Sequence, residues 1–162
     1  MGAKAIVEKE PRFLADSMLG KLARWLALLG YDAVFAGSAG QPDTALLERA
    51  RREDRIFLTR DTRIPPVSGL RMLVLRSEDL EGQLLFVMRE LGLKPDRKRL
   101  FTRCACCNLA LETLPRRQAL ALVPPLVREL PTDFRRCPGC GRVYWSGTHT
   151  RRAAARLDRL GL

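Results

Sequence analysis

Short apolar runs alternate with amphipathic segments along the first part of the chain. Four short apolar runs predict strands, at residues 12–15, 32–37, 55–60 and 71–76, of which the first is the candidate for a buried strand. Three segments with helical periodicity predict helices, at about residues 17–29, 42–53 and 80–91. Strands and helices in the order βαβαββα predict an α/β fold with a mainly parallel sheet that helices cover on both faces.

Spacing and capping residues define these helices further. The first helix presents one apolar stripe, made of Leu19, Leu22, Leu26 and Leu29. Gly30 after it supplies a left-handed stop, and Trp25 is interpreted as a core residue. Asp79 can cap the third helix, which Gly92 closes.

The chain changes character near residue 96. Residues 94–100 are polar and basic and mark a boundary, and beyond them helical periodicity is weak and prolines are frequent. We therefore expect a first domain at residues 12–96, a small module at 101–150 and a basic C-terminal helix or tail at 151–162. One face of that last helix would carry Arg152, Arg156 and Arg159.

Four of the five cysteines form two pairs, Cys104 with Cys107 and Cys137 with Cys140. Two residues between the members of a pair let a tight turn direct both thiolates at one ion, and Zn²⁺ takes four ligands in a tetrahedron. The 29 residues between the pairs indicate an insertion in a zinc ribbon. We expect one structural zinc ion and interpret Cys106 as a spectator. A redox Cys-x-x-Cys motif and inert buried cysteines are the alternatives.

Charge is distributed unevenly along the chain. Residues 1–96 hold 15 Lys and Arg against 14 Asp and Glu, a net charge of +1, whereas residues 97–162 hold 14 against 4, a net charge of +10. A positive field attracts polyanions, of which nucleic acid is the commonest inside cells. No apolar run approaches the roughly 20 residues of a membrane span. The first residues also lack the apolar core of a secretory signal, so we expect a cytoplasmic protein with no membrane partner.

Three aspartates fall at one edge of the predicted sheet. Asp16 ends the first strand, Asp61 follows the third, and Asp43 lies in the first turn of the helix after the second. Ligands bind at the carboxyl edge of open α/β sheets, so three carboxylates there predict a divalent metal ion. Helix capping explains each aspartate taken singly. Lys21 and Arg24 share a helix face near Asp16 and can meet a substrate phosphate, pair with these acids, or be solvated.

Aromatic and basic residues surround the second cysteine pair. Tyr144 and Trp145 follow it on a predicted strand, where their rings either pack over the small core of the ribbon or stack on a base. Nearby arginines suit phosphate contacts or form an ordinary solvated surface, namely Arg135, Arg136, Arg142, Arg151 and Arg152. We therefore expect this module to bind nucleic acid.

Motifs in both parts resemble those of PIN-like ribonucleases of the Mut-seven C-terminal RNase domain type. In the first domain they are FLADSMLGKLARWLALLGYD at 13–32, Asp43 with Leu46, Leu47 and Ala50, and LTRD at 58–61. In the module they are Cys104-x-x-Cys107-Asn108, Phe134 and Cys137-Pro-x-Cys140-Gly-Arg-Val-Tyr-Trp-x-Gly-x-His149. The resemblance covers about residues 12–150 and implies a PIN-like three-layer α/β/α domain fused to a zinc ribbon.

The resemblance also implies a Mg²⁺- or Mn²⁺-dependent nuclease site built from Asp16, Asp43 and Asp61. Many domains of this kind have a fourth acidic residue, for which Glu78 and Asp79 are the candidates here. We expect the bound metal to activate water for hydrolysis of RNA phosphodiester bonds.

In this interpretation Lys21 and Arg24 steady the RNA backbone while the basic zinc ribbon supplies most of the affinity. One alternative is a catalytically inactive adaptor that binds nucleic acid without turnover. Another is a protein-interaction module whose basic surface binds an acidic partner.

Overall fold

A computed structural model describes residues 10–37 and 40–162 of the chain. Residues 1–9 and 38–39 lie outside the described residues, and most of the stretch on which the expectation of no secretory signal rests is among them. In the described part, all helices are too short or too polar to cross a membrane.

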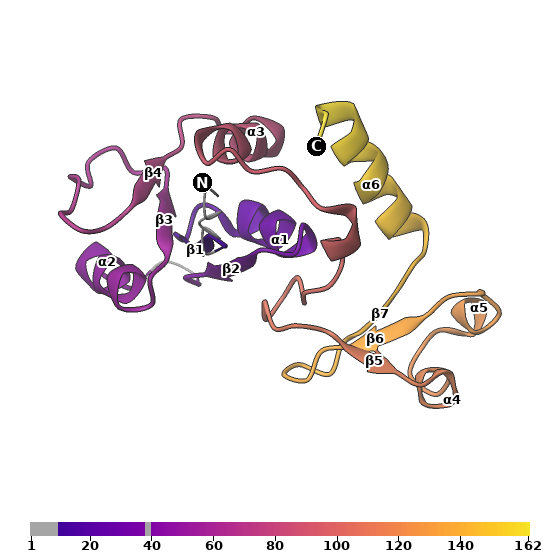
Figure 1. The fold of residues 1–162 in the computed structure, drawn as a ribbon. Coiled ribbons are helices and arrows are strands. Elements are labelled where there is room, and N and C mark those ends of the chain that lie inside the picture. Colours follow the sequence, from indigo (N-terminus) through magenta and orange to yellow (C-terminus); the bar gives the residue numbers. More distant parts are fainter. Residues whose placement is uncertain (1–9, 38–39) are drawn as a thin grey trace, which may run out of the picture.

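Four strands form the sheet of the first domain in the order β2-β1-β3-β4 (Figure 1). They are β1 (Arg12–Ala15), β2 (Asp32–Phe35), β3 (Ile56–Thr59) and β4 (Met72–Val74). Each neighbouring pair is parallel, which confirms the predicted sheet. The central strands are buried because helices cover both faces of the sheet, as is usual for parallel sheets.

Helices on the two faces give the domain three layers. Helices α1 (Gly20–Leu28) and α3 (Leu80–Glu90) pack on the face that carries Phe13 and Ala15. Helix α2 (Asp43–Arg52) packs on the opposite face, against Leu14. Successive strand residues point to opposite faces, so β1 contributes to both cores. The four leucines of the predicted stripe on the first helix are at most 1% exposed, which confirms that stripe.

Helix α1 begins at Gly20, three residues later than the pattern predicted. A turn after β1 takes up the difference, because the Leu19 N–H donates to the Asp16 carbonyl over 3.1 Å. The Met18 N–H donates to Asp16 Oδ1 over 2.9 Å. The turn therefore fixes the Asp16 side chain at the end of its strand.

A three-stranded antiparallel sheet forms the second part of the chain, in the order β5-β6-β7. Its strands are β5 (Glu112–Leu114), β6 (Phe134–Arg136) and β7 (Val143–Trp145). The predicted insertion contains two short helices, α4 (Arg116–Ala119) and α5 (Pro125–Arg128). These elements share a small separate core of Leu114, Ala119, Val123 and Phe134. A 3-10 turn, η1 (Arg97–Arg99), precedes the module.

The last helix, α6 (Thr148–Leu160), returns to the first domain and lies beside α3 in Figure 1. Leu157 is 2% exposed and belongs to the core that α1 and α3 share. Arg156 Nε contacts Glu81 Oε1 at 2.8 Å, and its guanidinium lies 5.4 Å from the centre of the Trp25 ring. The expected basic helix therefore exists, begins at Thr148, and uses one of its arginines to bind the first domain.

The turn between α1 and β2 depends on Gly30. Its φ is +90°, in the left-handed region, and a Cβ there would lie 2.7 Å from the Arg99 carbonyl oxygen. The Arg99 guanidinium donates to the Gly30 carbonyl over 2.8 Å, so the segment before the module lies directly on this turn.

We expect Gly30→Ala to lower the free energy of unfolding by about 3 kcal/mol, from backbone strain plus the steric overlap with Arg99. Gly92→Ala is the matched control, because φ is +61° and, among residues 10–37 and 40–162, no atom from beyond the neighbouring residues lies within 4 Å of the added Cβ. Strain alone should cost that variant about 1 kcal/mol. Urea titrations that give equal losses for both variants would contradict the proposed overlap.

Candidate functional site

Asp16, Asp43 and Asp61 line one small pocket, of about 90 Å³, at the carboxyl edge of the parallel sheet. Asp16 directly follows β1, Asp61 follows β3, and Asp43 is the first residue of α2. Because β1 and β3 run in the same direction, both chains leave the sheet at this edge. The structure therefore brings the three predicted acids to a common pocket.

The Asp16 carboxylate is 7% exposed and accepts three hydrogen bonds. Oδ1 accepts the Met18 N–H, and Oδ2 accepts the Thr59 hydroxyl and, over 3.3 Å, the Arg60 N–H. The Thr59 oxygen in turn accepts the Asp61 N–H over 2.9 Å. Thr59, which is fully buried, thus connects the backbone at Asp61 to the Asp16 side chain. Sequence reasoning took LTRD as a motif but did not identify this positioning role.

Arg63 binds the Asp61 carboxylate with both its side chain and its backbone. Its Nε lies 3.0 Å from Oδ1, its Nη2 lies 2.7 Å from Oδ2, and its N–H donates to Oδ1 over 2.8 Å. These hydrogen bonds lower the pKa of Asp61 to about 2. Asp43 also attracts Arg63, so one guanidinium faces two of the three acids. Asp61 is therefore ionised at neutral pH.

The three aspartates are less closely gathered than the cysteines. Within the described residues, the cysteines alone form a group of three or more potential metal ligands whose atoms all lie within 4.8 Å of one another. The carboxylates share a pocket but are held by protein donors, with Arg63 on Asp61. A divalent ion in this pocket would therefore have to compete with Arg63 for Asp61.

Both candidates for a fourth acid are engaged away from the pocket. Asp79 caps α3, accepting the Gly82 N–H over 2.8 Å and the Ser77 hydroxyl over 2.6 Å, and these bonds lower its pKa. This confirms the predicted cap. Glu78 forms an ion pair with Arg60 at 2.9 Å. Neither acid is among the residues that line the aspartate pocket.

The two basic candidates of the first domain lie on α1 and are both exposed. Arg24 lines a different pocket, between α1, β2 and the first cysteine turn. Neither Lys21 nor Arg24 lines the aspartate pocket. Their expected contact with a substrate phosphate stays a prediction.

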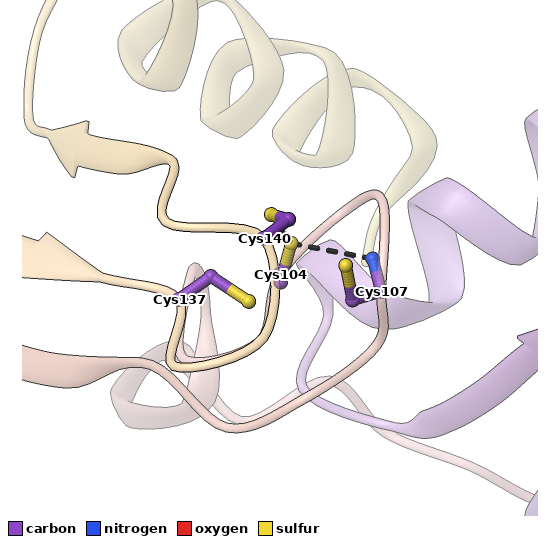
Figure 2. A group of neighbouring side chains, drawn as sticks. All are labelled: Cys104, Cys107, Cys137 and Cys140. Carbon is purple, nitrogen blue, oxygen red and sulfur yellow. Dashed lines mark hydrogen bonds between the residues drawn. The ribbon is translucent and has the colours of Figure 1, made fainter.

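Cys104, Cys107, Cys137 and Cys140 converge from two turns, as Figure 2 shows. The Sγ atoms of Cys104 and Cys140 are 3.7 Å apart. Tetrahedral Zn²⁺ with bonds of about 2.3 Å requires about 3.8 Å between its sulfur ligands. The four cysteines therefore lie close enough together to bind one metal ion such as zinc, and Cys106 is outside the group.

Hydrogen bonds prepare Cys104 for metal binding. Burial alone would raise the pKa of its thiol, but the Tyr144 hydroxyl, 3.0 Å from the sulfur, and the N–H groups of Cys107 and Cys106 lower it to about 6. The neighbouring sulfurs of Cys140 and Cys104 help to raise the pKa of Cys107 to about 12. Cysteine binds metal as the thiolate, and neighbouring thiolates repel one another. A bound divalent cation would offset this repulsion between the four sulfur atoms.

The aromatic residues of β7 are half-buried against the rest of the module. The Tyr144 hydroxyl contacts the Cys104 sulfur, and Trp145 packs against the small core that contains Phe134. Both placements favour the packing interpretation of these rings over the stacking one. The arginines that we expected to contact phosphate are all exposed, namely Arg135, Arg136, Arg142, Arg151 and Arg152.

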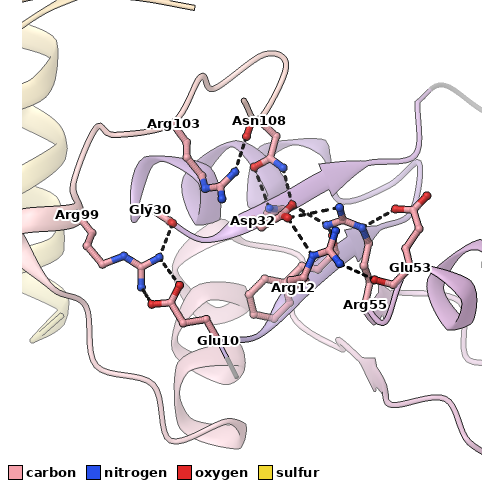
Figure 3. A network of polar contacts seen from close by, with 11 residues as sticks. Glu10, Arg12, Gly30, Asp32, Glu53, Arg55, Arg99, Arg103 and Asn108 are labelled. Carbon is pink, nitrogen blue, oxygen red and sulfur yellow. Dashed lines mark hydrogen bonds and ion pairs between the residues drawn. The ribbon is translucent and has the colours of Figure 1, made fainter. Parts of the chain in front are cut away.

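Asn108 connects the first cysteine turn to the edge of the parallel sheet (Figure 3). Its φ is +61°, its Oδ1 accepts the Ala33 N–H over 2.9 Å, and its Nδ2 donates to Asp32 Oδ1 over 2.7 Å. Asp32 also binds Arg55 at 2.6 Å and Arg12 at 3.0 Å. In the sequence Asn108 stands out only as part of a motif, and no local pattern signals a contact between residues 75 positions apart.

These features define a three-layer α/β domain with an acid-lined pocket at the carboxyl edge of its sheet, joined to a four-cysteine ribbon. The model of the Mut7-C RNAse domain family matches residues 11–157, and the chain therefore belongs to that family. This confirms the family resemblance and indicates a ribonuclease-type function that acts on RNA or another nucleic acid. No curated protein and no solved structure matches the chain.

We expect the wild-type chain to bind one zinc ion and Cys137→Ser to bind none, because a hydroxyl is a poor replacement for a thiolate ligand. Cys106→Ser is the matched control and should keep one zinc ion per chain. Atomic absorption after dialysis against a weak chelator measures this difference. Full zinc content in Cys137→Ser, or its loss in Cys106→Ser, would contradict the four-cysteine site.

Asp32 provides a pH-dependent prediction. Burial would raise its pKa, but hydrogen bonds from Arg55, Asn108 and Arg12 lower it to about 2, below an unfolded value of about 3.9. The charged carboxylate therefore stabilises the fold above about pH 4, and this contribution is lost as the pH falls toward 2.

Asp32→Asn should lower the free energy of unfolding at pH 7 by about 2 kcal/mol, because it removes one of the two carboxylates that pair with the buried Arg55 and leaves only Glu53. It should also flatten the loss of stability between pH 4 and pH 2. The exposed Asp133, replaced by Asn, is the control and should behave as wild type. An unchanged pH profile in Asp32→Asn would show that the network contributes little.

Proposed function

We propose that this protein is a divalent-metal-dependent ribonuclease that hydrolyses RNA phosphodiester bonds at the pocket of Asp16, Asp43 and Asp61. The observation that carries the proposal is that three carboxylates from separate elements line one pocket, in a chain of an RNase domain family. The site lies at the sheet edge where open α/β folds bind their ligands.

The residues of the pocket suit Mg²⁺ or Mn²⁺, which prefer carboxylate oxygens. Asp16 accepts three hydrogen bonds, and a carboxylate offers about four lone-pair positions, so one remains for a metal ion. Asp43 is exposed and has no hydrogen bond or ion pair within the described part of the chain. Asp61 becomes available when the Arg63 side chain, which is 89% exposed, turns away.

Such an ion supplies an activated water and neutralises charge on the scissile phosphate. The protein contributes the positions of the ligands. Thr59 and the turn at Met18 orient Asp16, and Thr59 also accepts the Asp61 N–H. Asp43 completes the set or orients the attacking water by accepting its proton. Arg63, once released from Asp61, is close enough to bind the phosphate.

The zinc ribbon has a separate task in this proposal. The four cysteines hold a structural zinc ion, and the exposed arginines of the ribbon and of α6 bind the RNA backbone in the cytoplasm. The net charge of +10 over residues 97–162 supports this division between a cutting domain and a binding module.

One observation favours a second candidate, an adaptor that binds nucleic acid without cutting it. Glu78 and Asp79 are engaged with Arg60 and with the start of α3, so among the described residues that line the pocket no fourth acid joins the three aspartates. The adaptor predicts salt-sensitive RNA binding with no turnover under any divalent metal.

Asp43→Asn tests the nuclease most cleanly, because Asp16→Asn would place an amide against the donors that hold Asp16. We expect Asp43→Asn to lower kcat/KM for RNA cleavage with Mn²⁺ about a thousandfold. Glu48→Gln, on the exposed side of the same helix, should cleave as wild type. Cleavage of a labelled RNA followed on gels, with EDTA as the blank, measures both.

Equal cleavage by wild type and Asp43→Asn would show that Asp43 takes no part in catalysis. Tight RNA binding by wild type with no cleavage in Mg²⁺ or Mn²⁺ would instead identify the adaptor. Circular dichroism of each variant separates loss of the site from loss of the fold.

A further inference from the structure

A groove lies between α1, the edge strand β2 and the first cysteine turn, and we call it the β2 groove. Its volume is about 260 Å³, and its walls include Arg24 from α1, Phe35 from β2 and Cys106 from the turn. The volume is just below the roughly 300–1,000 Å³ of pockets for drug-sized ligands. A single nucleotide is therefore a better match for it than a duplex.

Phe35 presents an aromatic ring at the wall of the groove. The residue is 41% exposed, and it is one of the large apolar residues that lie at the surface of the described part of the chain. The ring rests on α1 at Gly20, where an added Cβ would lie 3.2 Å from its carbons. An exposed ring supported from below by a helix is the arrangement that stacks on an unpaired base.

Arg24 gives the groove its charge. Its side chain is exposed and makes no hydrogen bond or ion pair within residues 10–37 and 40–162, whereas the side chains of Arg55 and Arg99 are engaged. No described residue that lines the groove is acidic. The Arg24 guanidinium is therefore available to bind an anionic group of a ligand, such as a phosphate.

Consecutive residues at the end of β2 line the β2 groove and the aspartate pocket. Phe35 lines the groove, and the next residues, Ala36 and Gly37, line the pocket. In the sheet Phe35 pairs with Ala15, which directly precedes Asp16. A strand whose phosphate lies in the pocket can therefore place its neighbouring nucleotide in the groove.

We propose that the β2 groove binds one unpaired RNA nucleotide beside the cleavage site, with the base stacked on Phe35 and the phosphate on Arg24. The inference rests on the proposed function for the identity of the neighbouring pocket. Stacking on Phe35 requires the RNA to be single-stranded at this position, because a base in a duplex has no free face for the ring. The first cysteine turn then serves as one wall of a substrate site as well as a metal site.

RNA binding tests the groove separately from cleavage. In an Asp43→Asn background with EDTA-free buffer and no added divalent metal, the anisotropy of a fluorescein-labelled eight-nucleotide single-stranded RNA reports affinity. We expect Phe35→Ser to weaken binding about tenfold, since a stacked base contributes that order of affinity. Phe35→Trp should restore it. Leu126→Ser, which removes a side chain that is 88% exposed on α5, is the control.

Salt dependence tests the arginine. Arg24→Gln should reduce the slope of log affinity against log salt by about 0.7, the value for one phosphate contact on a single strand. Arg71→Gln is the control, because Arg71 is exposed at the opposite edge of the sheet, before β4.

Alkylation of Cys106 gives a separate measure of whether RNA occupies the groove. This cysteine is exposed, lines the groove and lies outside the four-cysteine group. Bound RNA should slow its alkylation, with the modified residue identified by mass spectrometry.

Unchanged affinity in Phe35→Ser, together with alkylation of Cys106 that bound RNA does not slow, would contradict the proposed nucleotide site in the groove. Equal binding of a duplex of the same sequence would overturn the preference for an unpaired strand. Neither result depends on turnover. If the wild-type chain binds RNA through Phe35 but never cleaves it, the proposed nuclease fails and the groove stands.

Discussion

The parallel pairing of β1 with both β2 and β3 is the constraint on which the rest of the structure depends. Because the three strands run in one direction, the residues that follow them emerge at one edge, where open α/β sheets bind ligands. Asp16 and Asp61 follow β1 and β3 directly or nearly so, while Phe35 ends β2. The buried Thr59 hydroxyl donates to the Asp16 carboxylate and accepts the Asp61 N–H. The pairing of β1 with β3 therefore fixes the relative positions of these two aspartates in the pocket.

The same sheet explains why the ribbon is attached where it is. β2 is an edge strand, and an edge leaves backbone groups without partners. Asn108, directly after the first cysteine pair, satisfies the Ala33 N–H and joins the ion-pair network around Asp32. Helix α6 attaches the other end of the ribbon by burying Leu157 beneath α3 and by pairing Arg156 with Glu81. The cysteine turn thus covers the edge strand and also forms one wall of the β2 groove.

Much of the first domain was predictable because its signals are local. The apolar runs, the leucine stripe of α1, the cap at Asp79 and the left-handed Gly30 each depend on a few neighbouring residues, and all are confirmed. The cysteine pairs were equally clear, because spacing alone directs two thiolates at one ion. The shift in the start of α1 followed from a turn whose hydrogen bonds involve Asp16 itself.

What the sequence did not predict depends on how side chains are arranged in the folded chain. Arg63 lies two residues from Asp61, yet nothing in the pattern says that it binds that carboxylate. The Asn108 contact joins segments 75 positions apart. The docking of α6 was hidden because alanines fill much of its apolar face, so only its arginines stood out. The common edge of the three aspartates was predicted, but their shared pocket also depends on the sheet order, which the alternation of strands and helices leaves open.

The central claim is that three carboxylates at one sheet edge bind a divalent cation. An anomalous difference map from crystals soaked in Mn²⁺ tests it most directly. The account predicts a peak within ligand distance of Asp16, Asp43 and Asp61, with Arg63 turned away from Asp61. A map with no manganese in that pocket, and Arg63 still bound to Asp61 at saturating Mn²⁺, would contradict it.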